Sequence, residues 1–370
     1  MILIAILIFT HFYVGYFLDL FNNKFISHTI NCLLIGCIFY FTLGVTDTVD
    51  NPMYIYFFYN DWNKIDPMFV IMRDIMLSFG YDYFDFYKLH IIIFTLSYYF
   101  LISRYTHNVF YVFMAFVVLY YVPYINQIRY YLAFPFYLLS VHYLIRSRNV
   151  FLSVLFGLLA FLSHSAIILM FAFVPMYYLF SNRMYFTVVF SSSGLMFLLM
   201  MILFQMGIAQ QIDHFGEYFG KKAVSSFSGG MFNALPYFIY IGYLWYMDLR
   251  YRREYPNCDD DAYYSFLRKF SFFPIIFIPA SFFVQVLGHR YVFPLFIIWM
   301  LFFLYLIRNK LELEKLYHFI VFAAVHLLAA FVFYILPLYL FNYSQYQEEF
   351  LRSIKSIKYI NFYYFYNLLR

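Results

Sequence analysis

The sequence predicts an all-α polytopic integral membrane protein, with roughly 10–12 transmembrane helices and short or re-entrant helices around an outward-facing cavity. Of its 370 residues 65% are hydrophobic and only 12% are charged, whereas soluble domains average about 25% charged residues. The apolar runs are continuous, unlike the short alternating segments of barrel strands. The N-terminus has no basic region or small-residue cleavage site, so it is expected to be the first span and not a removable signal.

The expected spans are apolar runs that polar or charged residues separate. We assign them to one helical domain over residues 1–340, followed by an amphipathic and aromatic tail over 341–370. Within that domain, 45–85 is expected to be an extracytoplasmic loop and 249–269 a cytoplasmic loop. The spans are expected near residues 2–20, 28–44, 86–103, 109–125, 130–145, 150–163, 165–181, 184–206, 231–248, 270–287, 292–307 and 318–340.

The positive charges predict the orientation of the spans. One set of connections carries thirteen Lys and Arg residues, and the short loops of the other set carry only Arg129, Lys221, Lys222 and Arg290. Short loops rich in Lys and Arg stay in the cytoplasm, so the first set is expected there. The acidic loop 45–85 then lies outside, where its stretch Met68–Met72 is expected to form an interfacial amphipathic helix.

The chain between Arg148 and Arg183 has too few residues for two full spans. Two helices of about 15 residues reach about 22 Å each, and the hydrocarbon core is about 30 Å thick. We therefore expect a short or kinked helix pair, 150–163 and 165–181, with His164 at its apex. Irregular backbone at that depth is tolerated only against protein or a water-filled cavity, which predicts a cavity that opens outward.

Common cofactor and metal motifs do not occur in the sequence. Its three cysteines have neither zinc-site spacing nor the pattern of a disulfide framework, and it has no Gly-rich phosphate loop, HExxH or GxSxG. We interpret Asp259–Asp261 as a solvated charge run beside arginines. No metal and no cofactor are expected.

Arg129 lies where two apolar runs meet on the predicted outer face, two residues after Gln127 and three after Asn126. An arginine there suits a phosphate or diphosphate, which its guanidinium can bind through two charge-assisted hydrogen bonds. The alternative is an arginine that extends from a helix end to the membrane surface. The neighbouring Asn126 and Gln127 favour a substrate-binding role for all three residues.

His164, Asp47, Arg290 and His289 complete the candidate site, and the predicted topology places all of these positions on the outer face. His164 is a candidate general base or hydrogen-bond donor, although a lone histidine in an apolar setting is usually a core residue. Asp47 is the second catalytic candidate, with an ordinary solvated loop as the alternative. Arg290 is a candidate substrate-binding residue beside Gly288, which allows close backbone approach. His289 joins it as a candidate, although its pattern alone favours a structural role.

At these residues the sequence resembles the EpsG family of multi-pass proteins from exopolysaccharide and O-antigen clusters, which are treated as Wzy-type polymerases. The resemblance rests on Ile125–Ala133, on Leu162–Ala166 and on His289–Tyr291, with Gly44–Asp47 and Tyr54 in the same layout. It covers about residues 40–305. The chain differs from the family at two positions: Tyr130 replaces the usual Gln, and Asp66-Pro67-Met68-Phe69 lacks the Glu that often precedes it. No role is therefore assigned to those two positions.

The resemblance implies a polysaccharide polymerase, a metal-independent glycosyltransferase that joins polyprenyl-diphosphate-linked oligosaccharide repeat units at the outer leaflet of the bacterial cytoplasmic membrane. The substrates would be the undecaprenyl-diphosphate-linked units of an exopolysaccharide, O-antigen or capsule. Membrane lipid is an expected partner, a flippase and a chain-length regulator are candidate partners, and no nucleic acid is expected. The alternatives are another polyprenyl-sugar-dependent glycosyltransferase or ligase, and a lipid-linked oligosaccharide flippase.

Overall fold

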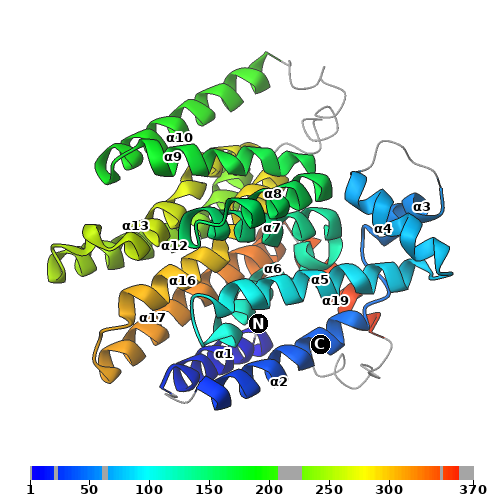
Figure 1. The fold of residues 1–370 in the computed structure, drawn as a ribbon, viewed down its shortest axis with the longest axis horizontal. Helices are drawn as coiled ribbons and strands as arrows, with labels where there is room; N and C mark the ends of the chain where they lie inside the picture. The colour runs from blue at the N-terminus through cyan, green and yellow to red at the C-terminus, as the bar shows by residue number, and fades with distance from the viewer. Residues whose placement is uncertain (1, 21–23, 61–65, 207–226, 342–344, 358–370) are drawn as a thin grey trace. The chain divides into compact units, whose positions relative to one another are not determined.

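The computed structural model describes residues 2–20, 24–60, 66–206, 227–341 and 345–357. Within these ranges the chain forms helices and no strand (Figure 1). The predicted all-α polytopic class is confirmed. The helices group into two compact units, one formed by residues 1–171 with 337–370 and the other by residues 172–336. The single domain expected over 1–340 stays a prediction.

The first unit holds the N-terminal helices and the C-terminal helix. Its helices coincide with the expected spans to within a few residues, and α3 and α4 occupy the expected loop 45–85. They are α1 (Ile2–Leu20), α2 (Lys24–Leu43), α3 (Asn51–Tyr59), α4 (Pro67–Ser78), α5 (Tyr83–Ser103), α6 (Val109–Asn126), α7 (Ile128–Val141), the π-helix η1 (His142–Arg146), α8 (Val150–Ser163), most of the 3₁₀ helix η2 (Ser165–Ala172), most of α18 (Leu336–Phe341), and α19 (Gln345–Lys355).

Helix α7 lies at the centre of this unit. It packs against α5 and α8, and α6 packs against α1, α2 and α5. Nearly every residue of α6 and α7 is buried, as expected for helices that are apolar on all faces. Gln127 alone separates the two helices, with φ −91° and ψ 55°. The first turn of α7 therefore follows the end of α6 after a single non-helical residue, and α7 packs along α8.

The expected short helix pair is present. Helix α8 ends at Ser163, His164 has an extended backbone (φ −163°, ψ 115°), and the chain continues as the 3₁₀ helix η2. A 3₁₀ run of eight residues is unusually long, and such a run within a longer helix often marks a functional hinge. The break that sequence length alone predicted therefore falls at His164.

The second unit contains the remaining helices. The α13–α14 helix begins at Ala262 rather than near residue 270, because the Asp261 side chain caps its N-terminus by accepting from the Tyr263 and Tyr264 amides. The predicted cytoplasmic loop is thus shorter than 249–269. The helices are α9 (Phe173–Leu179), α10 (Asn182–Gln205), α12 (Phe227–Glu254), η4 (Cys258–Asp260), α13 (Ala262–Phe272), η5 (Phe273–Phe277), α14 (Ile278–Phe283), α15 (Gln285–Tyr291), η6 (Phe293–Leu295), α16 (Phe296–Ile307), α17 (Glu312–Ala330) and η7 (Phe331–Ile335).

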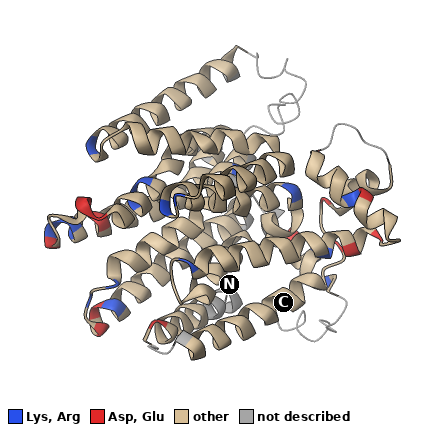
Figure 2. Ribbon diagram, viewed as in Figure 1, with Lys and Arg blue, Asp and Glu red and all other residues tan. Residues whose placement is uncertain are grey.

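Charged residues of the second unit gather at one end of its helices, at the end of α12, the start of α13 and the α16–α17 connection (Figure 2). Ion pairs join Arg252 to Asp259 and Lys310 to Glu254 there. Arg268 and Lys269, expected in a loop, are instead buried within α13. Arg268 forms an ion pair with the buried Asp248 at 2.9 Å. Several of the basic residues used to predict orientation, Arg252 and Lys310 among them, therefore lie at this end of the second unit.

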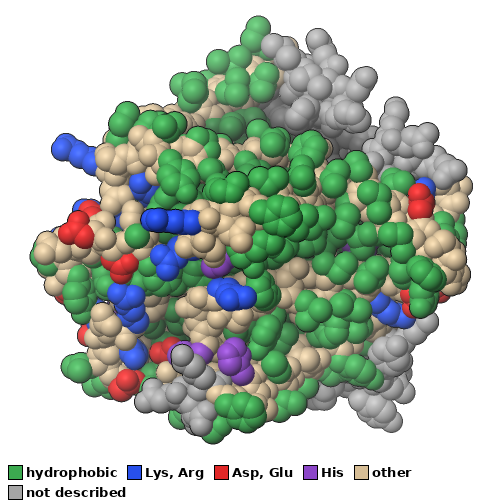
Figure 3. All heavy atoms as spheres, viewed as in Figure 1, with side chains coloured by type: hydrophobic (Ala, Val, Ile, Leu, Met, Phe, Trp, Pro, Cys, Tyr) green, Lys and Arg blue, Asp and Glu red, His purple; other side chains and the backbone are tan. Residues whose placement is uncertain are grey.

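Hydrophobic side chains, drawn green, form large patches on the face in view (Figure 3). Phe151, Leu195 and Leu179 are among its highly exposed apolar residues, and such a surface is typical of contact with lipid. By length and composition, six helices of the described residues could cross a membrane, and three shorter apolar helices accompany them. The outward-facing cavity stays a prediction.

Candidate functional site

Asp66 lies directly before α4, in the connection between α3 and α4. Helix α4 is held against the end of α3 by Arg73, whose guanidinium donates to the carbonyls of Phe57 and Asn60. The Phe69 ring also stacks on Tyr54, with centroids 6.0 Å apart. The Asp66 side chain makes no capping hydrogen bond to α4, so its carboxylate is directed to groups outside its own helix.

Arg129 lies in the first turn of α7 and binds this carboxylate. Its Nη1 donates to Asp66 Oδ2 at 2.8 Å. The guanidinium also lies over the Tyr54 ring, 5.5 Å from the centroid, which is within the range of a cation–π interaction. Arg129 is thus oriented by a carboxylate on one side and an aromatic face on another.

His164 binds the same oxygen of Asp66. Its Nδ1 lies 3.0 Å from Asp66 Oδ2, and its ring meets the Tyr130 ring edge-on at 5.1 Å. The extended backbone at the break after α8 turns the imidazole toward α4 and α7. One carboxylate oxygen therefore joins Arg129 and His164, which sequence analysis placed in separate spans.

The three side chains are mostly withdrawn from solvent, with exposed fractions of 10% for Asp66, 22% for Arg129 and 16% for His164. Burial alone would raise the pKa of Asp66. The hydrogen bond from His164 and the positive charge of Arg129 outweigh it, so the pKa of this carboxyl lies below its usual value. Asp66 is therefore ionised at neutral pH.

An ionised carboxylate can only accept hydrogen bonds, so His164 Nδ1 must carry a proton in this contact. The neutral imidazole then has its lone pair on Nε2. This atom is buried and has no hydrogen-bonding partner among the residues that the structure describes. The Asp66–His164 pair can accept a proton at Nε2 and stabilise the imidazolium that results.

Asn126 and Gln127 precede Arg129 at the joint of α6 and α7. The Asn126 amide donates to Glu349 Oε2 of α19 at 3.0 Å, which fixes the orientation of the amide. Asn126 Oδ1 and Gln127 Oε1 are buried acceptors for which no donor is found in the described part of the chain. Both residues offer buried acceptor oxygens at the joint that precedes Arg129, and their substrate-binding role stays a prediction.

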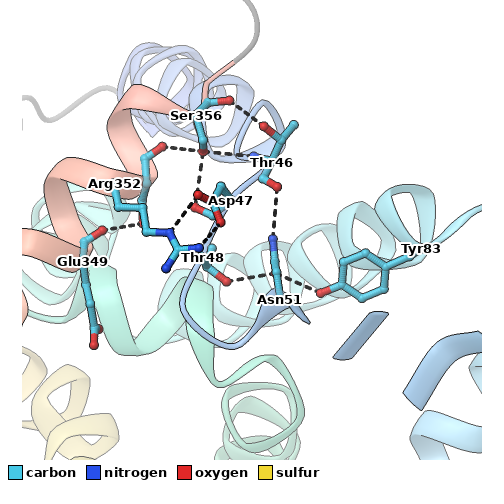
Figure 4. A network of polar contacts seen from close by, with 9 residues as sticks. Thr46, Asp47, Thr48, Asn51, Tyr83, Glu349, Arg352 and Ser356 are labelled. Carbon is cyan, nitrogen blue, oxygen red and sulfur yellow. Dashed lines mark hydrogen bonds and ion pairs between the residues drawn. The ribbon is translucent and has the colours of Figure 1, made fainter. Parts of the chain in front are cut away.

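Asp47 belongs to a second polar network, which holds α19 against the loop after α2 (Figure 4). Both of its carboxylate oxygens bind Arg352, each at 2.7 Å. Thr46 bonds to Ser356 in the same network, through its amide and its hydroxyl. The Asp47 and Arg352 side chains are 47% and 45% exposed. The catalytic role expected for Asp47 stays a prediction.

Arg290 and His289 lie in α15, in the second unit. Gly288 is required there by close packing, because a Cβ would lie 2.6 Å from the Ser281 Cβ and 2.7 Å from the Tyr237 hydroxyl. Arg290 is partly buried, and the His289 side chain lies outside what the structure describes. The joint action of Arg129 and Arg290 stays a prediction.

The comparison with protein families gives the family of the chain. The EpsG family model matches residues 25–348. The chain belongs to the EpsG family. No curated protein and no solved structure matches it. The matched region includes Asp66, Arg129, His164 and Arg290, so the whole candidate site lies within the part of the chain that defines EpsG membership.

Sequence analysis gave no role to Asp66 or Tyr130, because both depart from the EpsG pattern. In the structure Asp66 is the residue that joins Arg129 to His164, and Tyr130 packs on the His164 ring. The loop 45–85 contains eight other Asp, Lys or Arg residues, so charge alone did not distinguish Asp66. The available signal was its position directly before Pro67, where a helix can begin.

Proposed function

We propose that this EpsG protein is a polysaccharide polymerase that joins polyprenyl-diphosphate-linked oligosaccharide repeat units at the outer leaflet of the cytoplasmic membrane. The family suggests a polymerase-type function. The finer assignment, to lipid-linked repeat units and to the outer leaflet, rests on the chemistry of the candidate site and on the distribution of Lys and Arg. A flippase and a chain-length regulator are proposed partners.

The observation that carries this proposal is the meeting of Arg129 and His164 at one oxygen of Asp66. A glycosyl transfer from a lipid diphosphate needs a group that accepts the proton of the attacking hydroxyl. It also needs positive groups near the diphosphate, where negative charge develops. A histidine with a buried Nε2 and an arginine supply these two requirements within one cluster.

Glycosyl transfer fits the cluster better than simple transport of the same lipid. A flippase moves its cargo without making or breaking a bond, so it needs no proton acceptor. Carriers of that kind are often built from repeated halves, and no repeat is evident in the sequence. A ligase or another polyprenyl-sugar transferase would use the same two groups, and the identity of the product distinguishes these from a polymerase.

The test uses the full chain in lipid nanodiscs with a purified polyprenyl-diphosphate-linked repeat unit. We expect products of two or more repeat units and release of the polyprenyl diphosphate. His164→Ala should abolish both and leave the protein folded. The control is His142→Ala, since His142 is a part-buried histidine that hydrogen-bonds to Tyr105 at the other end of α7. Transfer of a single unit to a non-lipid acceptor would identify a ligase, and movement of lipid without release would overturn the proposal.

A further inference from the structure

We propose that the cluster around Asp66 is the acceptor-sugar site, with His164 Nε2 receiving the proton of the attacking hydroxyl and Asp66 acting as the positioning residue for His164. This inference rests on the proposed function and assigns a substrate part to the site. Asp66 is absent from the residues that the sequence indicated, and its role follows from its two contacts at 2.8 and 3.0 Å.

The polar atoms of the cluster fit a hydroxylated ligand. Buried acceptors occur at the end of α8, where His164 offers Nε2, and at the joint of α6 and α7 that precedes Arg129, where Gln127 offers Oε1 and Asn126 offers Oδ1. Each lacks a donor among the described residues, and a buried acceptor without a donor costs about 1–3 kcal/mol. Asn126 is only 6% exposed, and its amide orientation is set by Glu349. Sugar hydroxyls are donors of the kind that these three atoms lack.

The charge of the cluster supports the same assignment. Asp66 neutralises one positive charge, and with Arg129 it forms a pair of zero net charge beside a neutral imidazole. A diphosphate would place its negative charge close to the Asp66 carboxylate if it approached from that side. A neutral sugar hydroxyl is not repelled by the Asp66 carboxylate. The acceptor is therefore assigned to His164, with Gln127 as a second residue that can bind its hydroxyls.

The proposed step balances as follows. The acceptor oxygen forms a bond to the anomeric carbon of the donor sugar, and its proton passes to His164 Nε2. The bond between that carbon and the diphosphate oxygen breaks, and the electron pair leaves with the polyprenyl diphosphate. Asp66, already bound to Nδ1, stabilises the imidazolium that forms. The proton then passes to water, which restores the neutral imidazole.

Kinetics test the positioning role. Asp66→Asn should lower kcat by about 10²–10³ with little change in KM, because general-base catalysis typically contributes about 10²–10⁴. Asp66→Glu keeps a carboxylate and should retain more activity than Asp66→Asn. Gln127→Leu should instead raise the KM for the acceptor. The control is Asp74→Asn in α4, an exposed aspartate that pairs with its neighbour Arg73. Equal kcat for wild type and Asp66→Asn would overturn the proposal.

A second measurement does not depend on polymerisation. The full chain, labelled with ¹⁵N-histidine in lipid nanodiscs, gives a His164 signal that is identified by its loss in His164→Gln. We expect the neutral ring to carry its proton on Nδ1, and Asp66→Asn to shift the population toward Nε2–H. A wild-type ring protonated on Nε2, or a signal that Asp66→Asn leaves unchanged, would overturn the positioning role. If the tautomer is as expected but no polymer forms, the proposed function fails and the Asp66–His164 pair stands.

Discussion

The side-chain amide of Asn126 donates a hydrogen bond to Glu349 at 3.0 Å, although 223 positions separate the two residues along the chain. This contact joins the C-terminal helix α19 to the joint of α6 and α7. Arg129 lies in the first turn of α7, directly after that joint. Phe350 meets the Tyr121 ring edge-on at 5.9 Å in the same place. The tail 341–370, which the sequence indicated only as amphipathic and aromatic, therefore helps to hold the Asn126 amide in one orientation.

The Asp47–Arg352 pair makes the role of Asp47 testable. Both side chains are about half exposed, and exposed ion pairs contribute about 0–1 kcal/mol. We expect Asp47→Asn and Arg352→Gln to lower polymer yield equally and slightly, with the double variant no worse than either. The measurement is polymer length and amount at matched protein level. A much larger loss from Asp47→Asn than from Arg352→Gln would instead support the catalytic role predicted for Asp47.

The lowered pKa of Asp66 predicts a pH-dependent contribution to stability. Its folded-state pKa lies below the unfolded value of about 3.9. The ionised group therefore stabilises the fold above that value, and the contribution is lost as pH falls through the folded-state pKa. The unfolding free energy that separates wild type from Asp66→Asn should therefore shrink as pH falls below the unfolded-state pKa of about 3.9. Thermal unfolding of both proteins in detergent measures this, and a difference that grows as the pH is lowered through the acid range would contradict it.

The helices were largely predictable from the sequence because apolar runs and the charges between them carry the signal. The break at His164 was predictable as well, since chain length between Arg148 and Arg183 limits what the helices can span. Asp66 was not predictable from the same reasoning. Its importance comes from a meeting of α4, α7 and α8 that hydrophobic periodicity does not encode.

The helix boundary before Arg268 was missed for a related reason. Because they are charged, Arg268 and Lys269 were expected in a loop. Each has a specific partner in the fold that offsets the free-energy cost of burying its charge. Arg268 binds Asp248 and lies over the Phe186 ring at 4.1 Å. Lys269 donates to the carbonyls of Tyr177 and Phe180. A sequence shows the charges, and only the fold shows the partners.

Loss of the Asp248 carboxylate should destabilise the second unit. Asp248 is fully buried and accepts from Arg268 and the Tyr264 hydroxyl. Removal of one partner of a buried ion pair typically costs about 3–5 kcal/mol, because the other charge remains buried. We expect Asp248→Asn to lower the unfolding temperature in detergent clearly. Arg252→Gln, which breaks an exposed pair, is the control and should change it little. Equal effects of the two variants would contradict this account.

Reporter fusions test the predicted orientation. A fusion within residues 255–261, between α12 and α13, should report the cytoplasm, because the basic residues of the second unit gather at that end. A fusion within 207–226 should report the outside; this stretch lies outside the described residues. The reverse pattern would place the Asp66 cluster on the cytoplasmic side of the membrane and contradict polymerisation at the outer leaflet.

Arginine-to-lysine variants test whether Arg129 and Arg290 hold a diphosphate together. Lysine keeps the charge but cannot form two parallel hydrogen bonds to a phosphate. Loss of a group that acts mainly in the transition state costs roughly 10²–10³ in rate. Arg129→Lys and Arg290→Lys should each lose most polymerisation and accumulate single lipid-linked repeat units.

The double variant separates a shared role from two independent ones. Groups that act as a unit have non-additive effects, so Arg129→Lys with Arg290→Lys should be little worse than either single variant. Arg352→Lys is the matched control, since Arg352 is exposed and pairs with Asp47 away from the Asp66 cluster. A lysine extends to the membrane surface as well as an arginine does. Near-normal polymer from both single variants would therefore mean that these arginines only anchor helix ends, and the diphosphate would need another binding group.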